Sequence, residues 1–385
     1  MASTKEFFKQ KKEWSHYKDE LLGSYILPYF NKVMSTKVPI VYIDGFAGKG
    51  KFDDGTIGSP LLVKEKIYQA RKISKYATDI EAYFVESAYA DALVSNLKDS
   101  TMHVIKGNYR TAVPNILNNN VNKNIFLYVD PFGIKYLEFS IFSGLNTKKY
   151  HSVELLLNFN SFGFIREGCR LLKMDVKTDV DDIPEFSIEG DDLKNDIQNM
   201  NEIANGAYWQ QILRNYNAGK IDIFQAEEMF LKQYIIELKK TFNYVCKIPI
   251  RYSKSQLSKY QMIFATNNKH GILLMADKMI ACNNEMSLHI NNGQPSLFDY
   301  EYRSGNCLNF VEELLPTCFT ELKEFYYNIY NEKGFLYLTK DMNNAIKQLE
   351  ENGKVEIRRT PAHTPTGKIS RSMDYYKNTI KIRQK

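Results

Sequence analysis

Short apolar runs and segments of helical periodicity alternate over the first 160 residues of the chain. Five runs end in polar residues or glycine and are typical of buried strands: 38–43, 81–85, 102–105, 125–129 and 153–159. Between them, residues 60–74 and 88–97 carry apolar side chains at every third or fourth position, which predicts helices. This alternation predicts an α/β fold with a doubly wound, mostly parallel sheet. Ligands of such sheets bind beyond the carboxyl ends of the strands.

The remaining pattern adds helices and a late pair of strands to this sheet. Residues 5–34 have helical periodicity until Pro28, where we expect an interruption. Two β-rich runs, 244–252 and 260–266, are suited to complete the sheet. Three further segments are predicted to be helical: 203–240, 272–282 and 308–330.

The last 50 residues predict a small module of their own. A helix with Thr339 as its N-cap stops near Gly353, and a hairpin formed by 354–359 and 371–382 follows. The loop of this hairpin resembles the wing of a winged-helix module. We therefore expect three parts, which are an N-terminal helical cap at 1–35, a sheet domain at 36–300 with a helical insertion at about 165–240, and a C-terminal helical domain at 301–385.

Composition places the chain among ordinary globular proteins. It has 385 residues, of which 44% are hydrophobic and 25% are charged. We find no secretory signal and no apolar run of 18 residues, so no membrane span is expected. Five cysteines without a C-x-x-C pair predict a reduced, cytoplasmic protein without a metal site. The acidic stretch at 175–192 fits no calcium loop and predicts a solvated excursion.

The net charge of +6 comes entirely from the end of the chain. Residues 331–385 contain 12 Lys and Arg against 6 Asp and Glu, whereas the first 330 residues hold 39 of each sign. This distribution predicts one compact basic appendage that touches phosphate. Four residues of the hairpin region are the candidate contacts with nucleic acid, either DNA or RNA: Arg358, Arg359, Lys368 and Arg371.

The sharpest local motif is a glycine-rich turn after the first strand. Residues 38–43 lead directly into Asp44, Gly45, Phe46, Ala47, Gly48, Lys49 and Gly50. Gly45, Gly50 and Lys51 match a phosphate loop, but Phe52 stands where such a loop needs a hydroxyl for magnesium. A dinucleotide fingerprint needs G-x-G-x-x-G and an acid about 20 residues later, whereas Glu86 lies 36 residues after Gly50.

The ligand class that remains is S-adenosylmethionine, a nucleoside derivative without phosphates. Glu86 ends the second strand, where a carboxylate can bind ribose hydroxyls, and Asn108 follows the third strand, where an amide can bind adenine. The candidate cofactor-binding residues are Asp44, Gly45, Phe46, Ala47, Gly48, Gly50, Glu86 and Asn108.

The fourth strand ends in Asp130, Pro131, Phe132 and Gly133, which are the candidate catalytic residues. Methyl transfer to an exocyclic amine of a nucleobase needs acceptors for the amine hydrogens, and Asp130 with a backbone carbonyl can supply them. Phe132 offers an aromatic face for a base taken out of its stack. Asn158, at the end of the next strand, is expected to line the same pocket.

Several of these motifs together resemble the three-Cys-motif partner protein family (TcmP). The matching segments are Tyr42-Ile43-Asp44-Gly45-Phe46-Ala47-Gly48, Gly58-Ser59-Pro60, Asp130-Pro131-Phe132-Gly133, Leu156-Leu157-Asn158-Phe159 and Phe264-Ala265-Thr266-Asn267. The resemblance implies a bacterial protein with a methyltransferase-like Rossmann fold and a separate cysteine-motif partner protein. The segment Asp130–Gly133 also resembles the D-P-F-G of tRNA guanine N2-dimethyltransferases, which implies an amine acceptor. Adenine and cytosine methyltransferases usually carry D-P-P-Y or N-P-P-Y at this point.

The sequence thus favours an S-adenosylmethionine-dependent methyltransferase that acts on an exocyclic amine of a nucleic-acid base. The alternative is a catalytically inactive methyltransferase-fold adaptor that binds nucleic acid and a partner protein, with a role in phage defence. Intact carboxylates at three strand ends favour the enzyme.

Overall fold

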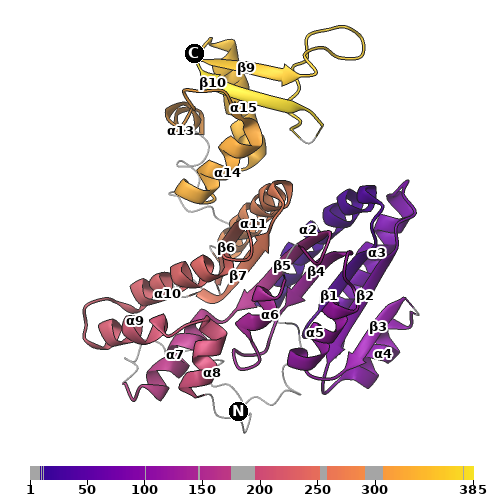
Figure 1. Ribbon diagram of the computed structural model, residues 1–385, viewed down its shortest axis with the longest axis vertical. Helices are drawn as coiled ribbons and strands as arrows, with labels where there is room; N and C mark the ends of the chain where they lie inside the picture. Colours follow the sequence, from indigo (N-terminus) through magenta and orange to yellow (C-terminus); the bar gives the residue numbers. More distant parts are fainter. Residues whose placement is uncertain are drawn as a thin grey trace. The chain divides into compact units, whose positions relative to one another are not determined.

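The chain divides into two compact units, Met1–Asn267 and Asn268–Lys385 (Figure 1). The computed structural model describes residues 9, 11, 13–99, 101–145, 148–174, 196–251, 258–290, 307–375 and 377–385. The division follows the last strand of the large sheet, earlier than the position near 300 that the sequence indicates. The acidic stretch at 175–192 lies outside the described residues.

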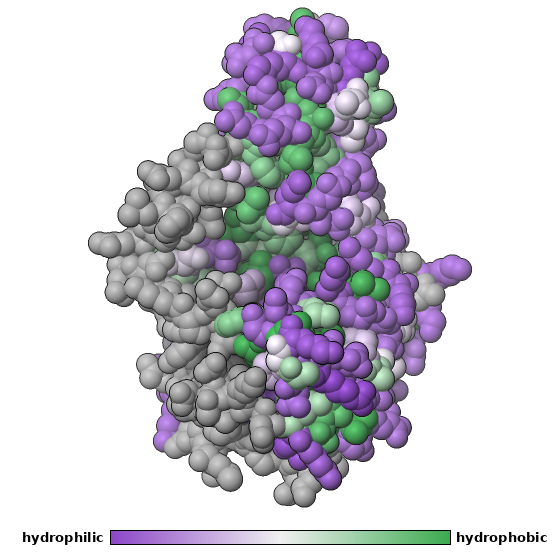
Figure 2. All heavy atoms as spheres, turned by 90° about the vertical axis from the view of Figure 1, so that its left-hand side faces the viewer, coloured by the Kyte–Doolittle hydropathy of each residue, from purple (hydrophilic) through white to green (hydrophobic). Residues whose placement is uncertain are grey.

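The surface of the described residues is mainly polar. Hydrophilic residues predominate on the face shown in Figure 2. Each helix that the structure describes is too short or too polar to cross a lipid bilayer.

A seven-stranded sheet forms the first unit. Its strands are β1 (Ile40–Asp44), β2 (Ile80–Glu86), β3 (Met102–Lys106), β4 (Asn124–Val129), β5 (Ser152–Phe159), β6 (Tyr244–Arg251) and β7 (Ser258–Thr266). They lie in the order β3-β2-β1-β4-β5-β7-β6; β1 to β5 are parallel, and β7 is antiparallel to both of its neighbours. All seven strands predicted from the apolar runs are confirmed. This strand order with an antiparallel β7 is that of the class I methyltransferase fold.

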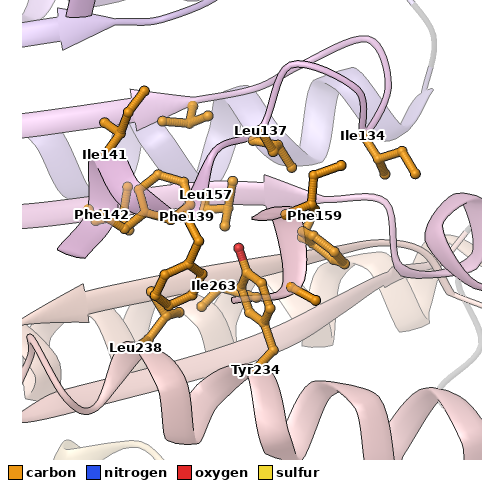
Figure 3. Packing of buried hydrophobic residues seen from close by; sticks show 14 of the residues in the cluster. Ile134, Leu137, Phe139, Ile141, Phe142, Leu157, Phe159, Tyr234, Leu238 and Ile263 are labelled. Carbon is orange, nitrogen blue, oxygen red and sulfur yellow. The ribbon is translucent and has the colours of Figure 1, made fainter. Parts of the chain in front are cut away.

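One face of the sheet is covered by helices that share a large apolar core. These helices are α5 (Tyr109–Asn118), α6 (Phe139–Ser143), α7 (Ser161–Leu171) and α10 (Ile223–Leu238), with α8 (Ile197–Ala204) and α9 (Tyr208–Asn217) beside them. Their apolar side chains meet alternate residues of the strands, as the two-residue period of a strand requires. Figure 3 shows Tyr234 of α10 pointing into the group that contains Phe139 and Phe159.

The opposite face is covered by α2 (Glu13–Val33), together with α3 (Ser59–Ile73) and α4 (Ala90–Leu97). Tyr25 of α2 packs against Phe126 of β4 and Phe264 of β7, with ring centroids 6.0 and 5.2 Å apart. The expected interruption at Pro28 is wrong, because the helix continues to Val33. Burial of this aromatic group offsets the hydrogen bond that a proline removes from a helix. A short 3-10 turn, Met34–Thr36, then leads towards β1.

The C-terminal unit combines helices with a three-stranded sheet. Its elements are α11 (Lys269–Ile290), α13 (Cys307–Glu313), β8 (Thr320–Glu321), α14 (Leu322–Lys333), α15 (Thr339–Glu351), β9 (Val355–Thr360) and β10 (Thr379–Gln384). The strands lie in the antiparallel order β8-β10-β9, so the predicted hairpin is confirmed. The helix predicted for 308–330 is instead two helices separated by β8.

Thr339 is the first residue of α15 and not its N-cap, which is Leu338. The Thr339 N–H and hydroxyl donate to the Asp277 carboxylate of α11 at 2.8 and 2.5 Å. The hydroxyl therefore bonds outside its own helix.

Candidate functional site

The glycine turn after β1 is held by its own backbone. Four successive N–H groups, from Gly45 to Gly48, all donate within the protein. Their acceptors are the Tyr128 carbonyl (2.9 Å), the Asp44 carboxylate (3.0 Å), the Val85 carbonyl (3.0 Å) and the Glu86 carboxylate (2.8 Å). A phosphate-binding turn presents such groups to its ligand. This turn therefore lacks the free donors that a phosphate requires at these four positions.

Glu86 ties the end of β2 to the glycine turn. Its Oε2 accepts from Gly48, and its Oε1 accepts from the N–H groups of Ala88 and Tyr89 at 2.8 and 3.1 Å. A carboxylate offers about four acceptor positions, so about one remains. Glu86 can thus bind one ribose hydroxyl as it stands, and the two-hydroxyl contact expected from the sequence requires that it release a backbone donor.

Asp44 is fully buried at the end of β1. Its Oδ1 accepts from Phe46, and its Oδ2 accepts from the Ser59 hydroxyl at 2.8 Å. Burial raises the pKa of Asp44 to about 7, against the lowering effect of these two hydrogen bonds. The carboxyl group therefore fixes the turn to the start of α3.

Packing explains two of the glycines at this edge of the sheet, and it leaves two others unexplained. A Cβ atom on Gly45 would lie 2.7 Å from the Tyr109 ring, and one on Gly50 would lie 2.8 Å from Leu93. At Gly107 and Gly133 a Cβ atom would meet no described atom within 4 Å. Space is therefore open beside the ends of β3 and β4, where the predicted ligand would lie.

The turn after β3 lies against the glycine turn. The rings of Phe46 and Tyr109 stack with centroids 4.8 Å apart. Asn108 is exposed, and its Oδ1 accepts from the Arg110 N–H at 2.8 Å as the N-cap of α5. The structure thus assigns the Asn108 oxygen to helix capping, and the contact of its amide with adenine stays a prediction.

Asp130 is held by three side chains from three different elements. Lys18 of α2 donates to both carboxylate oxygens at 2.8 and 2.7 Å, and Asn158 of β5 donates to Oδ1 at 2.6 Å. The Tyr128 hydroxyl donates to Oδ2 at 3.3 Å. Together they fill the four acceptor positions of the carboxylate. Asp130 therefore cannot accept an amine hydrogen without losing one of these partners, which corrects the role expected for it.

The rest of the D-P-F-G segment faces outward. Pro131 is buried, whereas the Phe132 side chain is 48% exposed and Gly133 borders open space. An exposed aromatic ring beside open space is suited to stack on a planar group.

Lys18 is the site residue that the sequence patterns did not reveal. It is buried, and its ammonium lies 5.0 Å from the centre of the Tyr260 ring of β7. Tyr17, Leu21 and Tyr25 form the buried stripe of the same helix, and Lys18 occupies a position within that stripe. A charged residue in an apolar stripe is the signal that could have identified it.

The start of α2 is fastened to the segment after the glycine turn. Lys11 forms an ion pair with Asp19 at 2.5 Å and donates to the Ile57 carbonyl at 2.8 Å. Burial raises the pKa of Asp19, while Lys11 lowers it in opposition. These contacts hold the end of the helix that carries Lys18.

The four predicted nucleic-acid contacts differ in their surroundings. Arg359 is buried and pairs with both carboxylate oxygens of Glu350 at 2.7 Å, so it belongs to the packing of the C-terminal unit. Arg358 stays 63% exposed, with its guanidinium 3.7 Å from the centre of the Phe319 ring. Lys368 and Arg371 are exposed. Three of the four are therefore placed to meet solvent.

Comparison with known proteins gives likenesses of shape at low sequence identity. A spermidine synthase in complex with a transition-state analogue matches with a TM-score of 0.33 and 10% identity over 76% of this chain and 74% of that chain. The spermidine synthase of Thermotoga maritima gives 0.34 and 9% over the same shares. The plantazolicin methyltransferase BamL gives 0.28 and 11% over 66% of this chain and 88% of its own. No protein-family model and no curated protein matches the chain.

The strand order, and not these likenesses, defines the class. The first unit is a class I methyltransferase fold, with its polar side chains gathered at the carboxyl ends of β1, β2, β4 and β5.

Proposed function

We propose that the protein is an S-adenosylmethionine-dependent methyltransferase that acts on an exocyclic amine of a nucleic-acid base. The observation that carries this proposal is the glycine turn of the class I sheet, whose four N–H groups are used within the protein beside Glu86. A nucleoside without phosphates suits a turn that has no donors to spare. The bound cofactor supplies a methyl group on a positively charged sulfur.

The residues at the edge of the sheet fit such a ligand. Glu86 has an acceptor position for a ribose hydroxyl, and Gly107 leaves room beside the end of β3. Asp44 keeps the turn in shape through Phe46 and Ser59. On the acceptor side, Phe132 would stack on the base, and Gly133 would let the base approach.

Calorimetric titration of the full chain tests the cofactor. We expect S-adenosylmethionine and S-adenosylhomocysteine to bind, and ATP to give no heat. Glu86→Gln should weaken binding by about tenfold or more, because it replaces a charge-assisted hydrogen bond. Glu81→Gln, on the same strand but at its other end, is the matched control and should bind normally. Binding of ATP in place of the methyl donor would reject the proposal.

The filled carboxylate of Asp130 favours a second candidate. An adaptor with a methyltransferase fold needs no acceptor for an amine, and Lys18 neutralises Asp130 as a purely structural pair would. Such an adaptor would bind nucleic acid through its C-terminal unit, and a three-Cys-motif partner protein elsewhere, in phage defence. It would give no heat with either methyl-donor compound and no transfer to oligonucleotides.

A further inference from the structure

Asn158 carries a buried hydrogen-bond acceptor that the fold leaves unused. The residue is 1% exposed, at the end of β5, and its Nδ2 donates to Asp130 Oδ1 at 2.6 Å. Its Oδ1 accepts no hydrogen bond from any residue that the structure describes. A buried polar atom without a partner costs about 1–3 kcal/mol, so folding alone gives no reason to keep it.

The orientation of this amide is fixed by its surroundings. An amide placed the other way round would set its oxygen against the Asp130 carboxylate, where two acceptors repel each other. Because Lys18 holds both oxygens of Asp130, the carboxylate in turn stays in place to bind the amide nitrogen. Lys18 and Asp130 therefore aim the Asn158 oxygen away from themselves.

The exposure of these side chains shows where a substrate would enter. Asp130 is the most open of the three, with 22% of its side chain exposed, against 8% for Lys18. Gly133, three residues after Asp130, borders open space. A planar base that slides past Gly133 reaches the group from the side of Asp130. Lys18, with a flexible stem of four carbons, is the side chain that shifts to admit it.

We propose that Asn158, and not Asp130, accepts a hydrogen of the substrate amine, with Asp130 and Lys18 as positioning residues. This inference rests on the proposed function. In the transfer, a bond forms between the amine nitrogen and the methyl carbon, and the bond between that carbon and the sulfur breaks, which leaves a neutral thioether. The nitrogen then loses one proton to water. The amide orients the amine for this step and is not the base.

Binding measurements with paired oligonucleotides test the inference. Single strands that carry adenine, cytosine or guanine are compared with matched strands that carry purine, 2-pyrimidinone or hypoxanthine, which lack the exocyclic amine. We expect the full chain to prefer at least one amine-bearing strand by about fivefold or more, in keeping with one buried hydrogen bond. Asn158→Ala should abolish this preference, while Asn158→Asp, which keeps an acceptor oxygen, should retain most of it.

Two controls separate the inference from the proposed function. Thermal unfolding and calorimetry with S-adenosylmethionine show whether each variant is folded and binds the donor. If the unaltered chain binds no donor, the proposed function fails and the inference fails with it. If the donor binds but Asn158→Ala keeps the amine preference, or Asn158→Asp loses it, Asn158 is not the acceptor, and the proposed function still stands.

Discussion

At the scale of single residues, the sheet buries acids that have no cation beside them. Glu154 of β5 is buried, and its oxygens accept from the Tyr25 hydroxyl at 2.7 Å and the Thr266 hydroxyl at 3.5 Å. Burial raises the pKa of Glu154 to about 7, and the two hydrogen bonds oppose that shift. The neutral acid is therefore the form that the fold accommodates.

The stability of the protein should reflect this carboxyl group. Between its ordinary pKa of 4.5 and about 7, the folded chain keeps a proton that the unfolded chain has lost, so stability falls as pH rises through this range. Glu154→Gln removes the effect. Its free energy of unfolding relative to the unaltered protein should rise by about 1–3 kcal/mol between pH 5 and pH 8 in urea titrations.

Glu65→Gln, at an exposed position of α3, is the control and should show no such trend. A constant difference for Glu154→Gln across the same range would mean that the group is already ionised in the fold.

At the scale of elements, the hairpin of β9 and β10 separates packing from solvent by alternation. Ile357 and Arg359 of β9 lie opposite Ile382 and Ile380 of β10, while Arg358 lies opposite Lys381. Arg359 is paired with Glu350 of α15, and Arg358 is exposed on Phe319. Neighbouring arginines thus have different tasks.

Two alanine variants should separate these tasks. Arg359→Ala should lower the free energy of unfolding by about 1–2 kcal/mol, because it leaves the partly exposed Glu350 without its partner. Arg358→Ala should leave thermal unfolding almost unchanged and weaken binding to a 20-base-pair duplex. The reverse result, with Arg359 important for binding and Arg358 for stability, would contradict the assignment of the two faces.

The order of strands and helices could be predicted because each element has its own apolar period. The seven buried strands and the glycine turn follow from runs that are complete within a few residues. The passage of α2 through Pro28 and the place of Lys18 could not, because both depend on aromatic residues and an acid far along the chain. Likewise, nothing local distinguishes Arg359 from Arg358 before Glu350 is placed.

At the scale of the whole molecule, the excess of positive charge belongs to the second unit. Residues 331–385 carry all of the net +6, and the remaining sequence is balanced. Most of these cations lie within the unit that begins at Asn268 and that we propose to contact phosphate.

The salt dependence of duplex binding measures that interaction. Replacing Arg358, Lys368 and Arg371 together by alanine should reduce the slope of log K against log salt by about 2–3, or nearly 1 for each phosphate that is no longer neutralised. A control with Lys72, Lys220 and Lys232 replaced removes the same charge from exposed positions of the first unit and should keep the slope. Equal reductions in both variants would show that only overall charge matters.

The pair of Lys18 and Asp130 joins residues 112 positions apart, and the Tyr260 ring beside the same ammonium comes from the last strand of the sheet. During synthesis on the ribosome, both ends of this arrangement must have emerged before it can close. A partly made chain therefore lacks a wall of its reaction chamber. The proposed chemistry begins only once translation has passed β7, which keeps unfinished molecules from modifying the nucleic acid around them.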